Sequence, residues 1–302
     1  MSAALVLGLS GPARALPIVD AAGVALTTGA TTAVQPPLRL AVTFDNTKVS
    51  LWTHSNQATM PVATSVVATG AGVVVRKHLT TSTIPDDVAA VPGVVAGNTE
   101  HGAFPAYSTD PTAQDFAGLA VTPLAPGPSD ILAPGLQDFT FGADFRLDRP
   151  LPADSRKYDE GNNVVQRGLT GDDQYKIQVD PTPGGEKLSC VLQEGATQTA
   201  FMVISKINVA GGVWYRARCT RTVVYGSDQV VMTLTNLSTG TLLETRTAIS
   251  MGPATNLDFP LASSATPTPL SVGVKLYPTG ELVKTMSDQV NGRIDNVYLA
   301  IG

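Results

Sequence analysis

Side chains able to bind a polar ligand recur at alternate positions in the middle of this chain. They are Arg167, Lys176, Gln178, Trp214, Arg216 and Arg218. Alternate residues of a β-strand point to the same face, so Lys176 shares a face with Gln178, and Trp214 shares one with the two arginines that follow it. If these faces coincide, cationic and amide donors beside an indole ring form a stripe that suits the hydroxyls, carboxylates or sulfates of a glycan. The alternative is an ordinary solvated sheet face, on which Arg and Lys stems cover the edge of the core. Trp214 is alternatively a core residue, if apolar residues outside the strands cover that face.

The only two cysteines, Cys190 and Cys219, fall in successive strand-like segments. A metal site would need histidine or further cysteine nearby, and the three histidines, at 54, 78 and 101, lie far away in sequence. A reactive thiol is the other alternative. We predict a structural disulfide, and with it an oxidising compartment.

Residue patterns for catalysis are weaker. A glycosidase needs two carboxylates placed across the sugar, but the paired carboxylates of this chain are adjacent in sequence and on a strand would point to opposite faces. These pairs are Asp86-Asp87, Asp159-Glu160 and Asp172-Asp173. The sequence also lacks the Gly-x-Ser-x-Gly element of many serine hydrolases. We therefore expect a binding protein. A divergent polysaccharide hydrolase or lyase is kept as a further alternative.

The composition favours strands over helices. The 302 residues are 43% hydrophobic but only 15% charged, with 28 glycines and 22 prolines, which suits short strands and tight turns. The net charge of −5 argues against a nucleic-acid partner. Apolar runs all fall short of the roughly 18 residues needed to span a bilayer, so we predict no membrane span.

Period-two alternation predicts an all-β fold. Phe139, Phe141, Ala143, Phe145 and Leu147 alternate with polar residues, as expected of a strand with one buried and one solvated face. Similar segments follow at 163–167, 174–179, 187–193, 200–207, 214–224, 229–237, 242–248, 270–276 and 293–301. Many strands separated by Gly-rich turns predict an antiparallel β-sandwich of the jelly-roll type.

The pattern along the chain predicts a single domain over residues 38–302, with a first strand at 38–45 and a loop-rich region at 53–100. Residues 16–37 are rich in Ala, Gly, Thr and Pro and are predicted to be a leader into the fold. Residues 1–15 carry a short apolar run before Ala13-Arg14-Ala15, which resembles the end of a secretory signal peptide. We therefore expect a secreted or cell-surface protein.

Several segments, taken in order, resemble laminin G-like, concanavalin A-like modules of secreted bacterial proteins. They are "DFTFGADFRL", "NNVVQRGLTGDDQYKIQVD", the cysteine-bearing pair "LSCVLQEG" and "GGVWYRARCTR", and "NGRIDNVYLAIG". The likeness covers about 136–302 and is weaker before that. Many such modules hold a structural calcium ion between an acidic residue on the last strand and oxygen atoms of the first. The resemblance therefore implies Ca²⁺ at Asp295 and Asp45, because hard oxygen ligands suit this ion.

Together these features predict a non-catalytic extracellular module that binds carbohydrate. The alternative is a structural or adhesive cell-surface module whose partner is another protein.

Overall fold

The computed structural model describes residues 38–42, 44, 66–68, 73–79, 102–103, 117–125, 129–148, 161–260, 267–283 and 288–302. The predictions for residues 1–15 and 16–37, and most of the loop-rich region at 53–100, lie outside these ranges. These ranges contain no α-helix, and therefore no helix long and apolar enough to cross a membrane.

Strands make up most of the described chain. They are β1 (Leu38–Val42), β2 (Val66–Ala68), β3 (Val73–Leu79), β4 (Gly102–Ala103), β5 (Ala117–Pro123), β6 (Phe139–Leu147), β7 (Asn162–Arg167), β8 (Gln174–Thr182), β9 (Gly185–Glu194), β10 (Thr199–Asn208), β11 (Trp214–Val224), β12 (Ser227–Asn236), β13 (Thr241–Ile249), β14 (Leu270–Val272) and β15 (Gly292–Ile301). Glycines with positive φ stand in the tight turns that join several of them, such as Gly212 and Gly226.

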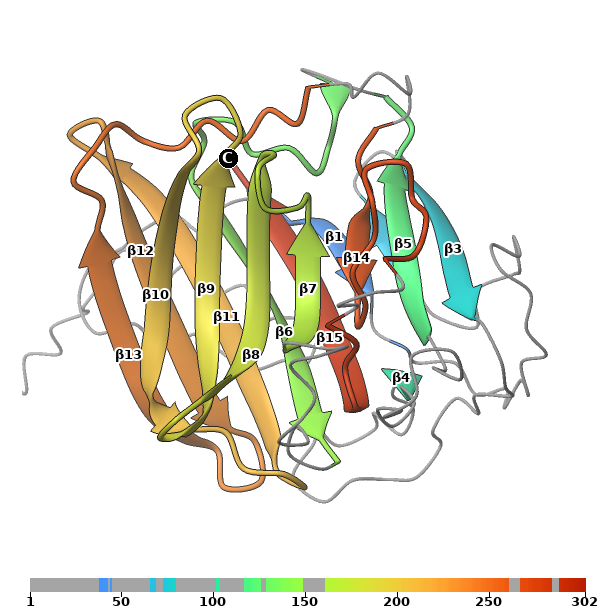
Figure 1. Cartoon of the computed structure of the whole chain (residues 1–302), viewed down its shortest axis with the longest axis vertical. Helices are drawn as coiled ribbons and strands as arrows, with labels where there is room; N and C mark the ends of the chain where they lie inside the picture. Colours follow the sequence, from blue (N-terminus) through green and yellow to red (C-terminus); the bar gives the residue numbers. More distant parts are fainter. Residues whose placement is uncertain are drawn as a thin grey trace, which may run out of the picture.

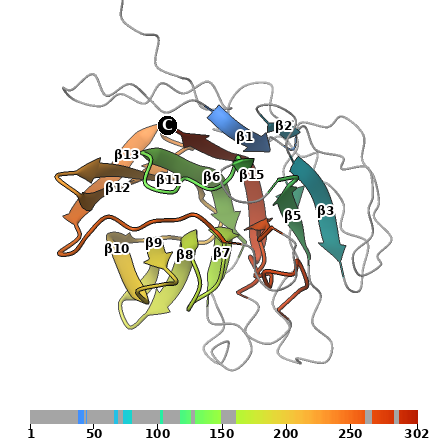
Figure 2. The ribbon, with the colours of Figure 1, turned by 90° about the horizontal axis from the view of Figure 1, so that it is seen from above.

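Two antiparallel sheets stack face to face (Figure 1). The eight-stranded sheet has the order β13-β12-β11-β6-β15-β1-β2, with β4 paired to β15. The seven-stranded sheet has the order β10-β9-β8-β7-β14-β5-β3. Figure 2 shows the layers edge-on, with β11, β6 and β15 in one and β10, β9 and β8 in the other. The predicted all-β jelly-roll sandwich is confirmed.

Aromatic side chains fill the space between the sheets. Phe139, Phe141 and Phe145 project inward from β6 and are fully buried. Tyr175 on β8 meets them from the other sheet, with ring centroids 5.0 Å from Phe141 and 5.5 Å from Phe139. Its hydroxyl donates to the Leu132 carbonyl at 3.0 Å, so its polar atom is satisfied inside the core. Burial of each such side chain stabilises the fold by about 1.5–3 kcal/mol.

The outward face of β6 is buried as well. Asp144 is fully buried and Thr140 nearly so, although both alternate with the core phenylalanines. The prediction of one buried and one solvated face is therefore wrong for this strand, because alternation reports which residues share a face and not whether that face is open.

The disulfide links the two layers of the sandwich. Cys190 on β9 and Cys219 on β11 are bonded, with their Cα atoms 6.1 Å apart and both side chains buried. The predicted disulfide is confirmed, and it connects opposite sheets. It closes a loop between positions 29 apart in sequence.

Removing the disulfide should weaken the fold without changing it. In the Cys190→Ala/Cys219→Ala variant we expect the free energy of unfolding to fall by about 3–4 kcal/mol, because the unfolded chain regains the entropy of the open loop. Urea unfolding under non-reducing conditions measures this. Reduced wild-type protein should unfold near the midpoint of the variant, and an unchanged midpoint in both would contradict the prediction.

Edge strands of the two sheets are joined by one carboxylate. Glu244 on β13 accepts hydrogen bonds from the Ser205 hydroxyl and from the backbone N–H of Lys206, at 2.9 Å, and of Ile207, at 3.4 Å. Burial raises the pKa of Glu244, but these hydrogen bonds and the charge of Arg246 outweigh it and hold the pKa below its ordinary value.

The depressed pKa of Glu244 gives a stability effect with a defined sign. A carboxyl whose folded-state pKa is lowered adds stability above its unfolded pKa and loses it as the pH falls through the folded value. At pH 7 we expect Glu244→Gln to lower the free energy of unfolding by about 1 kcal/mol. The gap from wild type should close as the pH falls through the lowered folded-state pKa of Glu244. Exposed Asp172→Asn is the matched control, and an equal loss in both variants would refute the effect.

Candidate functional site

The predicted stripe is divided between opposite outside faces of the sandwich. On β8, Ile177 points into the core, so Lys176 and Gln178 face outward from the seven-stranded sheet. On β11, Ala217 points into the core, so Arg216 and the alternate residues beside it face outward from the eight-stranded sheet. The two sets therefore do not form one surface, because β8 and β11 belong to different layers.

Arg216 is part of a buried ion pair. Its side chain is only 3% exposed, and its Nε and Nη2 donate to the two carboxylate oxygens of Asp144 on β6, each at 2.7 Å. Asn296 on β15 donates to the same carboxylate at 3.0 Å. This bidentate geometry is the strong form of an arginine–carboxylate contact, and it neutralises the guanidinium.

Arg218 lies flat across a glycine on the same face. Its guanidinium carbon is 4.2 Å from the centre of the Tyr298 ring, and its Nη2 is 3.8 Å from the Asp144 carboxylate. A Cβ at Gly142 would stand 2.8 Å from the Arg218 Cδ, so only glycine leaves room for this path. The cation is thereby stacked and partly neutralised within the fold.

Arg167 and Trp214 are buried too. Arg167 points inward, pairs with the Asp130 carboxylate and lies 4.0 Å over the Phe259 ring. Trp214 packs against Leu237 and is 1% exposed. The predicted solvated positions of Arg167 and of both β11 arginines are wrong, because packing and neighbouring carboxylates hold all three inside the structure. Trp214 follows the alternative prediction of a core position.

Loss of the Arg216 cation should be a stability defect. We expect Arg216→Met to lower the free energy of unfolding by about 3–5 kcal/mol, because it leaves the Asp144 carboxylate buried without its bidentate partner. Chemical denaturation measures this. Arg246→Met, on the edge strand β13, is the control and should cost under about 1 kcal/mol. If both variants lost the same small free energy of unfolding, the buried ion pair of Arg216 with Asp144 would be contradicted.

A second polar cluster lies on the outside of the seven-stranded sheet. We call it the outer-face cluster, and it comprises Asn163, Lys176, Gln178, Asp180, Ser189, Lys275 and Asp288. Three of these residues, Lys176, Gln178 and Asp180, are half-buried on β8 and form its accessible layer. The cluster therefore offers cation, amide and carboxylate groups at alternate positions of one strand.

Fully buried groups support the accessible layer from neighbouring strands. Asp180 Oδ2 accepts hydrogen bonds from Gln178 Nε2 at 2.7 Å and from Ser189 Oγ, on β9, at 2.9 Å. From β7, Asn163 Nδ2 donates to Asp288 Oδ2 at 3.1 Å. The direct pairing of Asn163 and Ser189 with Gln178 in the sheet places all three in one row. The amide and carboxylate are thus held in fixed orientations.

The accessible charges have perturbed pKa values. Burial lowers the pKa of the Lys176 ammonium; nearby Asp288 and Asp180 oppose this shift, while Lys275 adds to it. Burial raises the pKa of the Asp180 carboxyl, although its two hydrogen bonds and Lys176 oppose the shift. Perturbed groups of opposite sign close together are a common property of functional sites.

A short hairpin borders the cluster on one side. Leu276 and Leu282 pair across it and pack on Ala120 at the outside of β5. At its base Lys275 forms an ion pair of 2.5 Å with Asp288. Tyr277, near its turn, is 42% exposed and adds an aromatic surface to this border.

The sequence predicted only part of this cluster. Lys176 and Gln178 were predicted from their alternation, and Asp180 continues the same alternation one step further. The remaining members join the cluster because segments distant in sequence lie side by side in the fold, and no local sequence pattern predicts that placement. They are Asn163, Ser189, Lys275 and Asp288. Of the cluster residues that were not predicted, Asp180 is the one whose outward position could have been inferred from the alternation on its strand.

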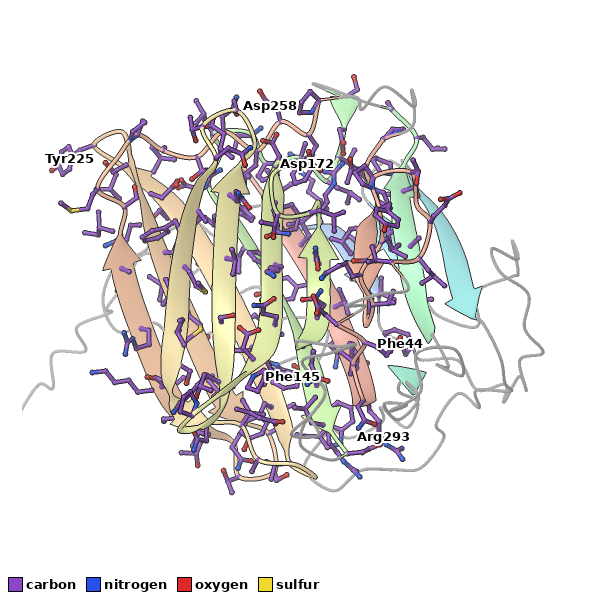
Figure 3. The ribbon with its side chains drawn as sticks, viewed as in Figure 1. Phe44, Phe145, Asp172, Tyr225, Asp258 and Arg293 are labelled. Carbon is purple, nitrogen blue, oxygen red and sulfur yellow. A yellow bond between two sulfur atoms is a disulfide. The ribbon has the colours of Figure 1, made fainter. Side chains whose placement is uncertain are left out.

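Carboxylates also gather at one end of the sandwich, where Figure 3 shows Asp172 and Asp258. Asp173 is nearly buried there, and its oxygens accept the backbone N–H of Gly195 and of Phe259 at 2.9 and 2.8 Å. These contacts hold two loops together. The pairs at 86–87 and 159–160 lie outside the described residues.

Calcium binding stays a prediction. Asp295 is fully buried on β15, where its Oδ1 accepts the backbone N–H of Asn296 at 2.7 Å. The other predicted ligand, Asp45, lies outside the described residues. Within the described part of the chain, no three His, Cys, Asp or Glu side chains gather as a metal site.

Comparisons with known proteins show no family for this chain. No protein-family model matches it, and no curated protein does. Solved structures similar to this chain share little sequence with it. A SAP-like pentraxin from Limulus polyphemus matches 66% of this chain and 76% of its own, with 13% identity and a TM-score of 0.41. The CBM40 domain of the Ruminococcus gnavus IT-sialidase matches 54% and 77%, with 9% identity and a TM-score of 0.34.

The third structure is tailspike protein 2 of an Escherichia coli O157:H7 bacteriophage. It matches 68% of this chain and 25% of its own, with 15% identity and a TM-score of 0.40, so the match spans a quarter of the tailspike. Likenesses this distant assign neither ligand nor activity. The laminin G-like resemblance stays a prediction, whereas the two sheets themselves establish the sandwich.

Proposed function

We propose that the protein is a non-catalytic module that binds carbohydrate through the outer-face cluster. The observation that carries this proposal is the pair of accessible side chains Gln178 and Asp180 on β8, in which the Gln178 amide is bonded to the Asp180 carboxylate and that carboxylate is held by buried Ser189. Sugar hydroxyls both donate and accept hydrogen bonds, so an adjacent amide and carboxylate suit a pair of them. Groups fixed in advance lose little entropy when the ligand binds.

The disulfide supports an extracellular setting, since such bonds persist in oxidising compartments. Secretion and a cell-surface partner are part of this proposal. Calcium enters it only as a structural ion, to be tested by binding assays with and without EDTA.

A glycan array probed with the full chain at neutral pH tests the proposed function. We expect binding to a restricted set of glycans. A flat array, with and without added calcium, would contradict carbohydrate binding and favour the adhesive module that binds protein. Release of reducing sugar from a bound polysaccharide would instead favour the hydrolase alternative.

The Gln178 amide should contribute directly to binding. We expect Gln178→Ala to weaken the best array ligand about tenfold, roughly 1.4 kcal/mol, because one amide contact is lost. Isothermal titration calorimetry measures the change. Gln229→Ala is the matched control, because Gln229 is a half-buried strand glutamine in the other sheet. Equal affinities in both variants would place the ligand elsewhere.

A further inference from the structure

We propose that the sugar bound at the outer-face cluster is anionic, and that its carboxylate or sulfate pairs with the Lys176 ammonium. This inference rests on the proposed carbohydrate binding and narrows it to acidic glycans. It starts from a difference between Lys176 and the other cations of the same face.

The neighbouring cations already have partners. Lys275 is paired with the Asp288 carboxylate at 2.5 Å, and the Lys187 ammonium on β9 donates to the Lys206 carbonyl. For Lys176, by contrast, the described residues provide no hydrogen bond and no ion pair within 4.0 Å, although it is half-buried. Its three N–H donors are therefore available to a ligand.

The residues paired with Lys176 in the sheet are uncharged, although Asp180, Asp288 and Lys275 lie near it on the same face. Directly beside it in the sheet are Val191 on β9 and Gln166 on β7, neither of which can pair with an ammonium as a charge. An anion bound over Lys176 would meet an apolar and an amide neighbour there. A carboxylate on the sugar would give the Lys176 ammonium an ion-pair partner, which the described residues do not provide.

The position of this ammonium is costly to the fold itself. Partial burial penalises its charged form, as the lowered pKa indicates. A methionine of similar length would remove this penalty and still cover Val191 and Gln166. If Lys176 is kept for ligand binding, Lys176→Met should leave the fold as stable or more stable. If Lys176 is kept for stability, the same substitution should destabilise the fold.

The charges around Lys176 also predict the pH dependence. The charges that act on its pKa are Asp288, Asp180 and Lys275. On β9, Lys187 lies opposite Asp180, and β7 supplies only neutral amides. Burial raises the pKa of Asp180, so this carboxylate becomes neutral at a higher pH than an ordinary aspartate as the pH falls. Its neutralisation removes a repulsive charge but leaves a carboxyl group that still forms hydrogen bonds with sugar hydroxyls, so an anionic sugar should then bind more tightly.

The experiment compares a charged ligand with its neutral form. Calorimetry of wild-type protein with trigalacturonate and with its methyl ester should show at least tenfold tighter binding of the charged form at low salt. Lys176→Met should abolish this preference while the melting temperature stays equal or rises. Lys187→Met, which removes another cation from the same face, should change the affinity less than twofold.

A tetrasaccharide of κ-carrageenan, whose only anionic groups are sulfates, separates the two anion types. Between pH 6 and pH 4 its affinity should rise, whereas that of trigalacturonate should rise and then fall as the ligand's own carboxylates protonate. Equal binding of trigalacturonate and its ester, or equal losses in Lys176→Met and Lys187→Met, would overturn the inference. Neutral glycans bound on the array would then leave carbohydrate binding intact. A flat array would instead refute the proposed function itself.

Discussion

The contact of Tyr175 with the phenylalanines of β6 determines how the rest of the molecule is arranged. These rings come from opposite sheets and meet in the middle of the sandwich, with centroids 5.0–5.5 Å apart. Once they face inward, strand geometry directs every alternate residue of β6 and β8 outward. The disulfide between β9 and β11 holds the same two layers together close by. The chemistry available on each outside face follows from this single core.

The two outside faces differ in how they treat charge. On the eight-stranded sheet, Arg216 and Arg218 share the Asp144 carboxylate and are buried with it. Charges removed from water in this way must be compensated inside the fold, and here they are. On the seven-stranded sheet, no described carboxylate pairs directly with the Lys176 ammonium, and Asp288 and Asp180 offset its burial only in part. A protein tends to retain an unfavourable charge where function requires it.

Local sequence predicts the strands well. The expected ranges 139–147 and 214–224 coincide with β6 and β11, and most other predicted strands differ by only one or a few residues at their ends. The inward side of β6 is also correct, since its alternating apolar residues all enter the core. Periodicity is a property of neighbouring residues, so it can be read without knowledge of the fold.

Site geometry is harder to predict, because it depends on which sheet each strand joins. Arg216 and Asp144 are 72 positions apart, and Asn163 and Asp288 are 125 apart. Alternation places Lys176 and Arg216 each on a face, but it cannot state that the faces lie on opposite sides of the molecule. It also cannot distinguish a solvated face from a covered one. For these two reasons the prediction of one solvated stripe containing the arginines was wrong.

The carboxylate of Glu244 has a consequence for encounters between molecules. β10 ends the seven-stranded sheet, and its outer edge would otherwise present unpaired N–H groups on which a foreign strand could dock. By accepting the N–H of Lys206 and of Ile207, Glu244 occupies two of these groups and places a negative charge beside them. This edge is thereby made a poor template for fibril growth.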